Sequence, residues 1–395
     1  MIRILFAAAI VLLFLASWIY LPAPNRALLA LGVGAPEVCA WLALGGLAVA
    51  ALSSTAGDGG SLARAALAIS VITVAIAAVP LFRLPSLSRR FDAAMRAALG
   101  QDFLHGVPAE RRARLRPSPF SVRDLLLGIE AADARVTRGI LFAAPAGVQL
   151  TLDVYRPPAA GRYPAVVQIY GGAWQRGAPG DDAAFASHLA ARGFVVFAVD
   201  YRHAPQWQWP AQSDDVAAAL AWIGQHGADY DADTSRLALL GRSAGAHLAM
   251  LAAYRQPAAP RVAAVVSYYG PVDLIEGYRN PPQPDPLDVR AIEEAFLGGT
   301  PEQRPAPYRD ASPISHVSRQ LPPSLLIYGG RDHIVLSRFG AALDARLRAA
   351  GATSVFLEIP WAEHAFDVIR NGPSGQLALY YTEQFLAWAL TRVTA

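Results

Sequence analysis

The first part of the chain is dominated by three long apolar runs, at residues 4–21, 27–52 and 65–82. The first and third contain no charged side chain, and Glu37 is the only one in the second. A helix needs about 20 mainly apolar residues to cross the hydrocarbon layer of a membrane. We therefore predict that residues 1–84 form a membrane anchor of about three transmembrane helices, which makes this a multi-pass protein with the lipid bilayer as a partner.

Two other interpretations of these runs are weaker. A signal peptide explains the first run alone, but two more runs behind it favour anchoring over cleavage. A buried helical hairpin of a soluble protein is a second alternative, but the runs lack the polar face that such helices show. Because a carboxylate is costly in the middle of a bilayer, we expect Glu37 to lie in a break or near an interface.

The arginines that flank the runs predict an orientation, because positive residues favour the cytoplasmic side of a membrane. One side would carry two of them, Arg3 and Arg64. The other side would carry five: Arg26, Arg83, Arg89, Arg90 and Arg96. This second side also holds the C-terminal part of the chain, so we predict that this part is cytoplasmic. If one of the three runs did not span the membrane, the predicted orientation would be reversed.

The composition and the pattern of the sequence change after the apolar runs. Residues 85–135 are rich in arginine and predict a basic linker, in which 91–99 form either an amphipathic helix on anionic headgroups or a solvated stretch. From residue 136, short apolar runs alternate with helical patterns. The predicted strands are 138–142, 148–155, 165–170, 194–199, 237–240, 262–269, 324–328 and 354–359. We predict an α/β fold with a doubly wound, mostly parallel sheet over residues 136–395. A proline-rich insertion at 273–321 interrupts the alternation and predicts a lid or binding element.

A strand, a tight turn and a helix come together around Ser243. The apolar stretch 237–240 enters Gly-Arg-Ser-Ala-Gly at 241–245, and a helix-favouring stretch, 246–254, follows. In a G-x-S-x-G turn the two glycines allow a sharp bend, which exposes the serine hydroxyl beside a helix N-terminus. The strand before it and the helix after it favour a nucleophile over an idle serine.

A serine hydroxyl needs a base and a third group that orients this base. Asp332 follows the strand 324–328 and His364 follows the strand 354–359, so both lie at carboxyl ends of later strands. In this arrangement Ser243 attacks an acyl carbon, His364 takes its proton and Asp332 orients the imidazole. Asp273 is the alternative acid.

The other titratable neighbours have structural interpretations. We expect a structural hydrogen bond for His247, which lies one turn after the nucleophile, and an incidental role for His333. The oxyanion of a tetrahedral intermediate needs backbone N–H donors. Gly171, Gly172 and Ala173, which follow the strand 165–170, are the candidates together with Ala244 after the nucleophile.

Composition excludes several other classes of protein. The chain has 395 residues, 54% of them hydrophobic, and its net charge of +3 gives no case for nucleic-acid binding. A single cysteine, Cys39, excludes an intrachain disulfide. The eight histidines are scattered, so no metal site and no organic cofactor are implied.

The motifs in residues 136–390 resemble those of the α/β-hydrolase fold, within its esterase group with an H-G-G-G-W oxyanion motif. The corresponding stretches here are 170–174, Tyr-Gly-Gly-Ala-Trp; 200–205, Asp-Tyr-Arg-His-Ala-Pro; and 241–245. Tyr170 replaces the histidine of the family and Ala173 its third glycine. The Ser-Ala-Gly-Ala-His extension is similar to that of prenylcysteine methylesterases and kynurenine formamidase-like enzymes.

These patterns predict a membrane-anchored serine carboxylesterase that hydrolyses an apolar, small-molecule ester through an acyl-enzyme intermediate. Two alternatives stay open. The same side chains would serve a prenylcysteine methylesterase or a formamidase-type hydrolase. A protein that uses a hydrolase fold for binding, without turnover, is a different class, against which the complete set of Ser243, Asp332 and His364 argues.

Overall fold

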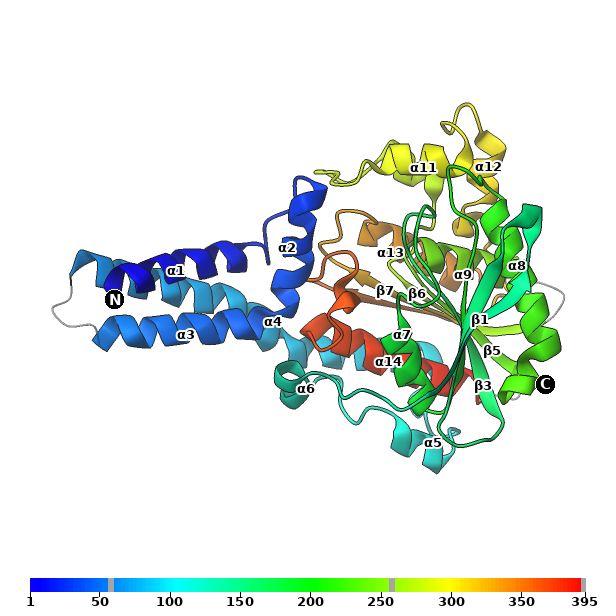
Figure 1. Ribbon diagram of the computed structural model, residues 1–395, viewed down its shortest axis with the longest axis horizontal. Helices are drawn as coiled ribbons and strands as arrows, with labels where there is room; N and C mark the ends of the chain where they lie inside the picture. The colour runs from blue at the N-terminus through cyan, green and yellow to red at the C-terminus, as the bar shows by residue number, and fades with distance from the viewer. Residues whose placement is uncertain (56–59, 256–259, 392–395) are drawn as a thin grey trace.

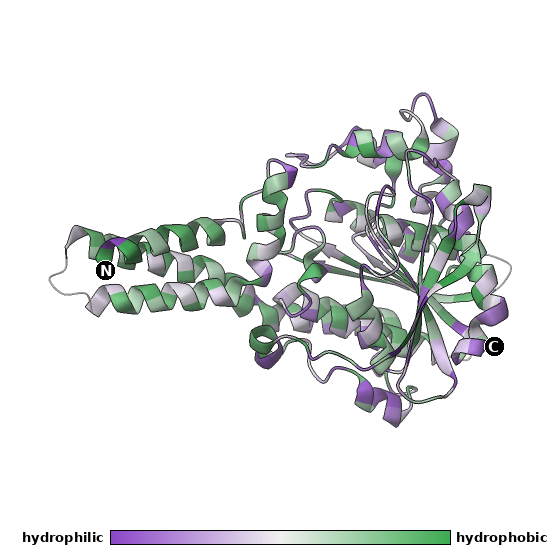
Figure 2. Ribbon diagram, viewed as in Figure 1, coloured by the Kyte–Doolittle hydropathy of each residue, from purple (hydrophilic) through white to green (hydrophobic). Residues whose placement is uncertain are grey.

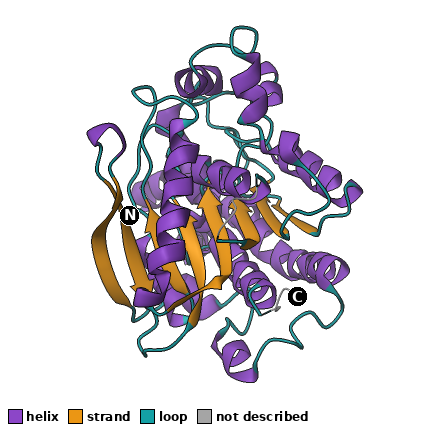
Figure 3. Ribbon diagram, turned by 90° about the vertical axis from the view of Figure 1, so that its right-hand side faces the viewer, coloured by secondary structure: helices purple, strands orange, loops and turns teal. Residues whose placement is uncertain are grey.

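The computed structural model describes residues 1–55, 60–255 and 260–391, so the last four residues of the predicted sheet-containing domain lie outside the description. Eight strands form one sheet, drawn in orange in Figure 3, in the order β1-β2-β4-β3-β5-β6-β7-β8. In chain order they are β1 (Arg135–Ala143), β2 (Leu150–Arg156), β3 (Tyr163–Ile169), β4 (Val195–Val199), β5 (Ala232–Arg242), β6 (Val262–Tyr268), β7 (Ser324–Gly329) and β8 (Ser354–Ile359). β2 pairs antiparallel with β1 and β4, and all the remaining pairs are parallel. The predicted mostly parallel sheet is confirmed.

Helices cover both faces of this sheet (Figure 3). They are α7 (Ala183–Ala191), α8 (Ala211–His226), α9 (Ala244–Tyr254), α13 (Ser337–Ala349) and α14 (Pro373–Ala389). Short 3-10 turns join the elements: η1 (Pro145–Gly147), η2 (Gly227–Tyr230) and η4 (Phe366–Val368). Every residue of β4 and of β7 is buried, which explains why the central strands are continuous apolar runs rather than alternating ones.

Three apolar helices project from the sheet-containing part, with the N-terminus at their far end (Figure 1). They are α1 (Ile2–Ser17), α3 (Cys39–Thr55) and the first half of α4 (Ser61–Leu99), and Figure 2 colours them mostly as hydrophobic. Within the described chain α4 is the one helix that is long and apolar enough to cross a membrane unaided. α1 has 16 residues and is shorter than the usual span.

The second apolar run is two helices, not the single span that we predicted. α2 (Arg26–Glu37) and α3 meet at an angle of 78°, just after Pro36. Glu37 lies at this break, as expected, and its buried carboxylate accepts a hydrogen bond from the backbone N–H of Ser374 at 2.9 Å. The residue at the break is therefore attached to the start of α14.

α4 is continuous over 39 residues and passes from the projecting helices into the main hydrophobic core. Its last part contains the stretch 91–99, predicted as a separate amphipathic helix or a solvated linker. The side chains of Phe91 and Met95 are buried there. The ring of Phe91 packs against that of Tyr381, with their centroids 5.3 Å apart. The apolar face of this stretch is therefore covered by protein. The following loop contains only two short helices, α5 (Ala109–Arg114) and α6 (Val122–Leu127), in the described chain.

The proline-rich insertion lies over the carboxyl ends of the strands, where α11 and α12 are drawn in yellow in Figure 1. Its longest helix is α11 (Val289–Leu297). Three further short pieces are α10 (Leu274–Arg279), α12 (Pro305–Asp310) and η3 (Pro313–His316). The ring of Phe296 stacks on that of Trp174, with centroids 4.2 Å apart, which attaches α11 to the loop after β3.

Candidate active site

Ser243 stands between β5 and α9 in a strained backbone conformation, with φ 51° and ψ −122°. A Cβ atom at position 241 would lie 2.3 Å from the backbone of Gly245. A Cβ atom at position 245 would lie 2.2 Å from the carbonyl oxygen of Ile169. Both glycines are therefore required by close backbone approach, and the turn that they allow holds the serine at the carboxyl end of the sheet.

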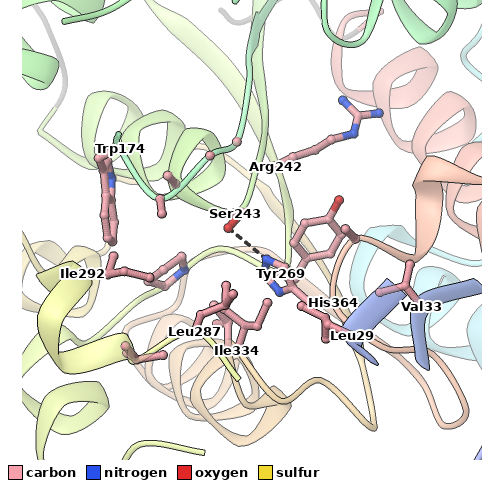
Figure 4. Close-up of a pocket in the computed structure, with 18 of the residues that line it drawn as sticks. Leu29, Val33, Trp174, Arg242, Ser243, Tyr269, Leu287, Ile292, Ile334 and His364 are labelled. Carbon is pink, nitrogen blue, oxygen red and sulfur yellow. Dashed lines mark hydrogen bonds between the residues drawn. The ribbon is translucent and has the colours of Figure 1, made fainter. Parts of the chain in front are cut away.

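The structure brings Ser243, His364 and Asp332 into one hydrogen-bonded chain. His364 Nε2 lies 2.9 Å from the Oγ of Ser243, and its Nδ1 lies 2.8 Å from the Oδ2 of Asp332. The other carboxylate oxygen of Asp332 accepts two backbone hydrogen bonds, from Ile334 at 2.8 Å and Val335 at 2.7 Å. These bonds fix the carboxylate, so it holds the imidazole with Nε2 facing the serine. Figure 4 shows the serine and the histidine facing each other.

The alternative acid, Asp273, does not reach the histidine. Its carboxylate caps α10 by accepting a hydrogen bond from the backbone N–H of Glu276 at 3.0 Å. His333 is not incidental to the loop, contrary to our expectation. It pairs with the buried Glu363 at 2.9 Å, and Glu363 also accepts the backbone N–H of His364 at 3.2 Å. This pair braces the loop that carries the histidine.

The loop after β3 approaches the serine closely. A Cβ atom at position 171 would lie 3.3 Å from the Cβ of Ser243 and 2.9 Å from the carbonyl oxygen of residue 242, so the approach depends on Gly171. Gly172 has φ 129° and Ala173 has φ 57°. Within the described residues, the backbone N–H groups of Gly172 and Ala173 donate no hydrogen bond. They are available, like the N–H of Ala244 at the start of α9, to a ligand oxygen.

Tyr170 stands where the esterase group with the H-G-G-G-W motif has a histidine, and its hydrogen bonds support the loop after β3. Its hydroxyl donates to Asp200 at 2.5 Å and also lies 2.9 Å from the Nε2 of His203. Its ring stacks on that of Tyr201, with centroids 4.5 Å apart. The segment that follows β4 therefore holds Tyr170, the residue that directly precedes Gly171 in the loop after β3.

His247 makes the structural hydrogen bonds that we predicted. Its Nε2 donates to the carbonyl oxygen of Ala311 at 2.6 Å, and its Nδ1 accepts from the indole of Trp174 at 3.2 Å. Burial lowers the pKa of His247 to about 3, so this side chain is neutral. It joins the loop after β3 to the insertion.

Sequence reasoning missed a buried ionic group directly beside the serine. The guanidinium of Arg242 pairs with Asp367 and, at 3.2 Å, with Asp182. It also lies over the ring of Phe185, 4.2 Å from its centroid. Asp367 accepts in addition from the hydroxyl of Tyr269, whose ring packs against that of His364. The position between the two motif glycines showed an arginine, but nothing in the sequence indicated its distant partners.

A cavity of about 610 Å³ opens over Ser243. Apolar side chains line it on both sides of the serine in Figure 4, with Leu29 and Val33 on one side and Leu287 and Ile292 on the other. The first pair belongs to α2 and the second to the insertion. Sequence analysis placed α2 in a transmembrane span, so it gave no signal for this wall.

The described residues contain no group of three or more histidine, cysteine, aspartate or glutamate side chains that could hold a metal ion. The groups that the site brings together are a hydroxyl, an imidazole, a carboxylate and backbone N–H groups that donate no hydrogen bond within the described residues.

Comparisons with known proteins place the fold in a defined class. The BD-FAE family matches residues 152–347. An esterase from Pyrobaculum calidifontis is structurally similar, with a TM-score of 0.58 and 25% sequence identity, and the match covers 71% of this chain and 97% of that one. The fold and this arrangement of side chains define an α/β-hydrolase.

Sequence relatives identify the family more closely. The probable carboxylic ester hydrolase LipM of Mycobacterium tuberculosis is 31% identical over 82% of this chain and 79% of its own length. The probable isoprenylcysteine α-carbonyl methylesterase ICMEL1 of Arabidopsis thaliana is 26% identical over 51% of this chain and 45% of its own. The chain belongs to the α/β-hydrolase carboxylesterases. It is an ester-hydrolysing enzyme, as predicted, and not the non-catalytic binding protein that was the alternative.

Proposed function

We propose that the chain is a membrane-anchored serine carboxylesterase in which Ser243 is the nucleophile, His364 the general base and Asp332 the residue that orients it. The continuous hydrogen bonds from Oγ to Nε2, at 2.9 Å, and from Nδ1 to Oδ2, at 2.8 Å, carry this proposal. They run into the cavity that the apolar side chains line, where an ester has room to reach the serine.

The reaction follows from these positions. The Oγ of Ser243 attacks the ester carbonyl carbon while His364 takes its proton, and the resulting oxyanion accepts hydrogen bonds from the backbone N–H groups of Gly172, Ala173 and Ala244. The imidazolium then gives the proton to the departing alcohol, which leaves an acyl group on the serine. A water molecule, deprotonated by His364, attacks this acyl group and releases the carboxylic acid.

A fluorophosphonate probe, which phosphonylates activated serines, tests the nucleophile. The wild-type protein should be labelled and the Ser243→Ala variant should not. His364→Ala should remove nearly all turnover of a short-chain aryl ester. An unlabelled wild-type protein, or full turnover in His364→Ala, would refute the assignment.

The acid is tested separately with a matched pair of variants. Asp332→Asn should lower kcat by about 10⁴-fold, as in other triads that lose the orienting carboxylate. Asp273→Asn should stay close to the wild type, because its carboxylate caps a helix. If Asp273→Asn lowered kcat strongly and Asp332→Asn did not, the orienting role would belong to Asp273.

Exposed apolar side chains on the projecting helices support the membrane anchor. Large ones more than a third exposed include Ile4, Val11, Phe14, Trp41, Leu44, Leu47, Val71 and Ile72. A soluble protein rarely presents so many together, whereas lipid chains would cover them. Residues 65–82 of α4 carry no charge and, at 1.5 Å per residue, extend about 27 Å. An anchor of this kind favours substrates that partition into lipid.

We extend the proposal to the orientation and the number of passes. Arg3 is in the first turn of α1 and Arg64 is in the first turn of α4, and both helices start at the end of the projecting region that is farther from the sheet (Figure 1). The larger group of arginines comes from the start of α2 and the later part of α4. Three antiparallel passes, made by α1, α3 and the first half of α4, then place the enzyme on the cytoplasmic side. A C-terminal reporter that matures only outside the cytoplasm should stay dark, and a bright fusion would refute this topology.

A second candidate reaction is the demethylation of a prenylated cysteine ester, which the similarity to the Arabidopsis protein favours. Hydrolysis of a formamide would use the same side chains. Measuring kcat/KM on a matched set of a prenylcysteine methyl ester, an alkyl ester, a thioester and a formamide separates these reactions, since the preferred substrate should exceed the others clearly. A preference for the alkyl ester would reject both alternatives.

A further inference from the structure

One buried carboxyl group in the cavity has no hydrogen-bond partner among the described residues. Glu293, on α11, lines the cavity and is only 3% exposed. Its Oε2 atom has no hydrogen-bond partner, and neither carboxylate oxygen takes part in an ion pair within the described residues. By contrast, Arg242 in the same cavity is paired with two carboxylates. An unsatisfied buried carboxyl group costs stability, so its presence points to a ligand.

The surroundings of Glu293 favour the neutral acid over the carboxylate. Burial raises its pKa well above the usual range, and the charge of Asp273 adds to this effect. The neighbouring Glu294 is different, because it accepts a hydrogen bond from the hydroxyl of Tyr278 at 2.6 Å. A protonated Glu293 offers one O–H donor and one carbonyl acceptor to whatever occupies the cavity.

A glycine lets this carboxyl group pack closely against α10. Gly277, which also lines the cavity, would bring a Cβ atom within 3.1 Å of the Oε1 of Glu293. The position of α11 is fixed by the stack of Phe296 on Trp174, next to the proposed oxyanion donors. The carboxyl group therefore has a set place relative to Ser243, and its unpartnered Oε2 belongs to a residue that lines the same cavity.

We infer that Glu293 binds a hydroxyl group of the ester substrate and so makes the enzyme selective for hydroxylated esters. This inference rests on the proposed serine esterase reaction at the same site. A hydroxyl group donates and accepts, which matches the neutral acid, and it brings no further charge to a carboxyl group that already faces the charge of Asp273. An ammonium group would instead require the carboxylate form and the desolvation of two charges.

The test compares matched esters with the full-length enzyme in detergent micelles. One series contains ω-hydroxyalkyl butyrates of increasing length, each paired with the alkyl ester in which a methyl group replaces the hydroxyl. A second series places the hydroxyl in the acyl part, and a third replaces it by an ammonium group. The variants are Glu293→Leu, Glu293→Gln and, as the matched control, Glu294→Gln.

We expect the wild type to prefer a hydroxylated ester in the first or second series by about tenfold in kcat/KM, the size of one satisfied buried hydrogen bond. Glu293→Leu should remove this preference. Glu293→Gln should keep most of it, because an amide also donates and accepts, and Glu294→Gln should match the wild type. The far-UV circular-dichroism spectrum of each variant serves as the folding control and should match that of the wild type.

Three results would overturn the inference: no preference for a hydroxyl in either series, a preference that survives in Glu293→Leu, or a Glu293-dependent preference for the ammonium esters. These results are independent of the nucleophile assignment. If the serine esterase proposal itself fails, Ser243→Ala will still hydrolyse the plain alkyl esters, whereas the ratio between paired esters measures Glu293 alone.

Discussion

Acid should destabilise this protein through a single buried histidine, His247. Both of its ring nitrogens are committed while it is neutral: Nε2 donates to the carbonyl oxygen of Ala311, and Nδ1 accepts from the indole N–H of Trp174. Adding a proton to Nδ1 would set two N–H donors against each other in a site without solvent. The folded protein therefore resists protonation, while the unfolded chain accepts the proton freely.

The magnitude follows from the difference between the two states. The pKa of His247 is about 3 in the folded protein and about 6.5 when it is exposed. A lowered folded-state pKa leaves the full stability in place above pH 6.5 and removes it as the pH falls toward 3. At about 1.4 kcal/mol per pKa unit, the loss reaches roughly 2 kcal/mol at pH 5 and about 4 kcal/mol at pH 3.

The assay is urea unfolding of the full-length protein in detergent micelles, followed by tryptophan fluorescence between pH 8 and pH 5. The comparison variant is His247→Gln, which cannot titrate. It should be about 1–3 kcal/mol less stable at pH 8, because hydrogen bonds are weakened, yet it should lose about 2 kcal/mol less than the wild type on going to pH 5. Subtracting the two curves cancels every other titrating group.

Parallel curves for the wild type and His247→Gln would refute this reasoning, because the histidine would then titrate alike in the folded and unfolded states. A pKa near 6.5, measured for this ring by NMR, would refute it directly.

Three further predictions concern the surroundings of the serine. Arg242→Met should lower the free energy of unfolding by about 3–5 kcal/mol in urea titrations, because it leaves the buried carboxylate of Asp367 without its ion-pair partner; a loss below 1 kcal/mol would contradict the buried ion pair. Tyr170→Phe removes the hydroxyl that joins Asp200 and His203, so kcat should fall by about tenfold with little change in KM in ester hydrolysis assays; an unchanged kcat would show that the hydroxyl does not position the turn. Gly245→Ala places a Cβ atom 2.2 Å from a carbonyl oxygen of β3 and should abolish soluble expression or fluorophosphonate labelling; normal labelling would contradict the glycine requirement.

The strand, the turn and the helix around Ser243 could be predicted because their signals are local. A buried parallel strand is a short apolar run, and the glycines at 241 and 245 mark a backbone approach that excludes a side chain. The two partners could be predicted as well, since Asp332 and His364 each follow a strand and the carboxyl ends of parallel strands share one edge. Local pattern and topology together were sufficient for these positions.

The walls of the cavity could not be predicted, because they depend on contacts between distant segments. Leu29 and Val33 belong to an apolar run whose pattern is equally typical of a transmembrane helix. The one local sign of a different fate was Glu37, and its partner Ser374 lies in the last helix of the chain. Glu293 shared this problem, because a glutamate pair in a short helix is usually solvent-exposed, and only the packing of the insertion buries one of the two.

Two helices of the apolar region, α4 and α2, are attached to the enzyme in different ways. Together they restrict the direction in which the opening of the cavity can face. α4 runs without interruption from the projecting helices into the core, where Phe91 packs against Tyr381. α2 is held to α14 through Glu37 and presents Leu29 to the cavity. In the proposed membrane arrangement, α2 lies where the chain leaves the bilayer, and it also forms one wall of the site. An apolar ester that leaves the lipid along α2 would reach Ser243 without first entering bulk water, which fits the aliphatic side chains of Leu29 and Val33 that this helix presents to the cavity.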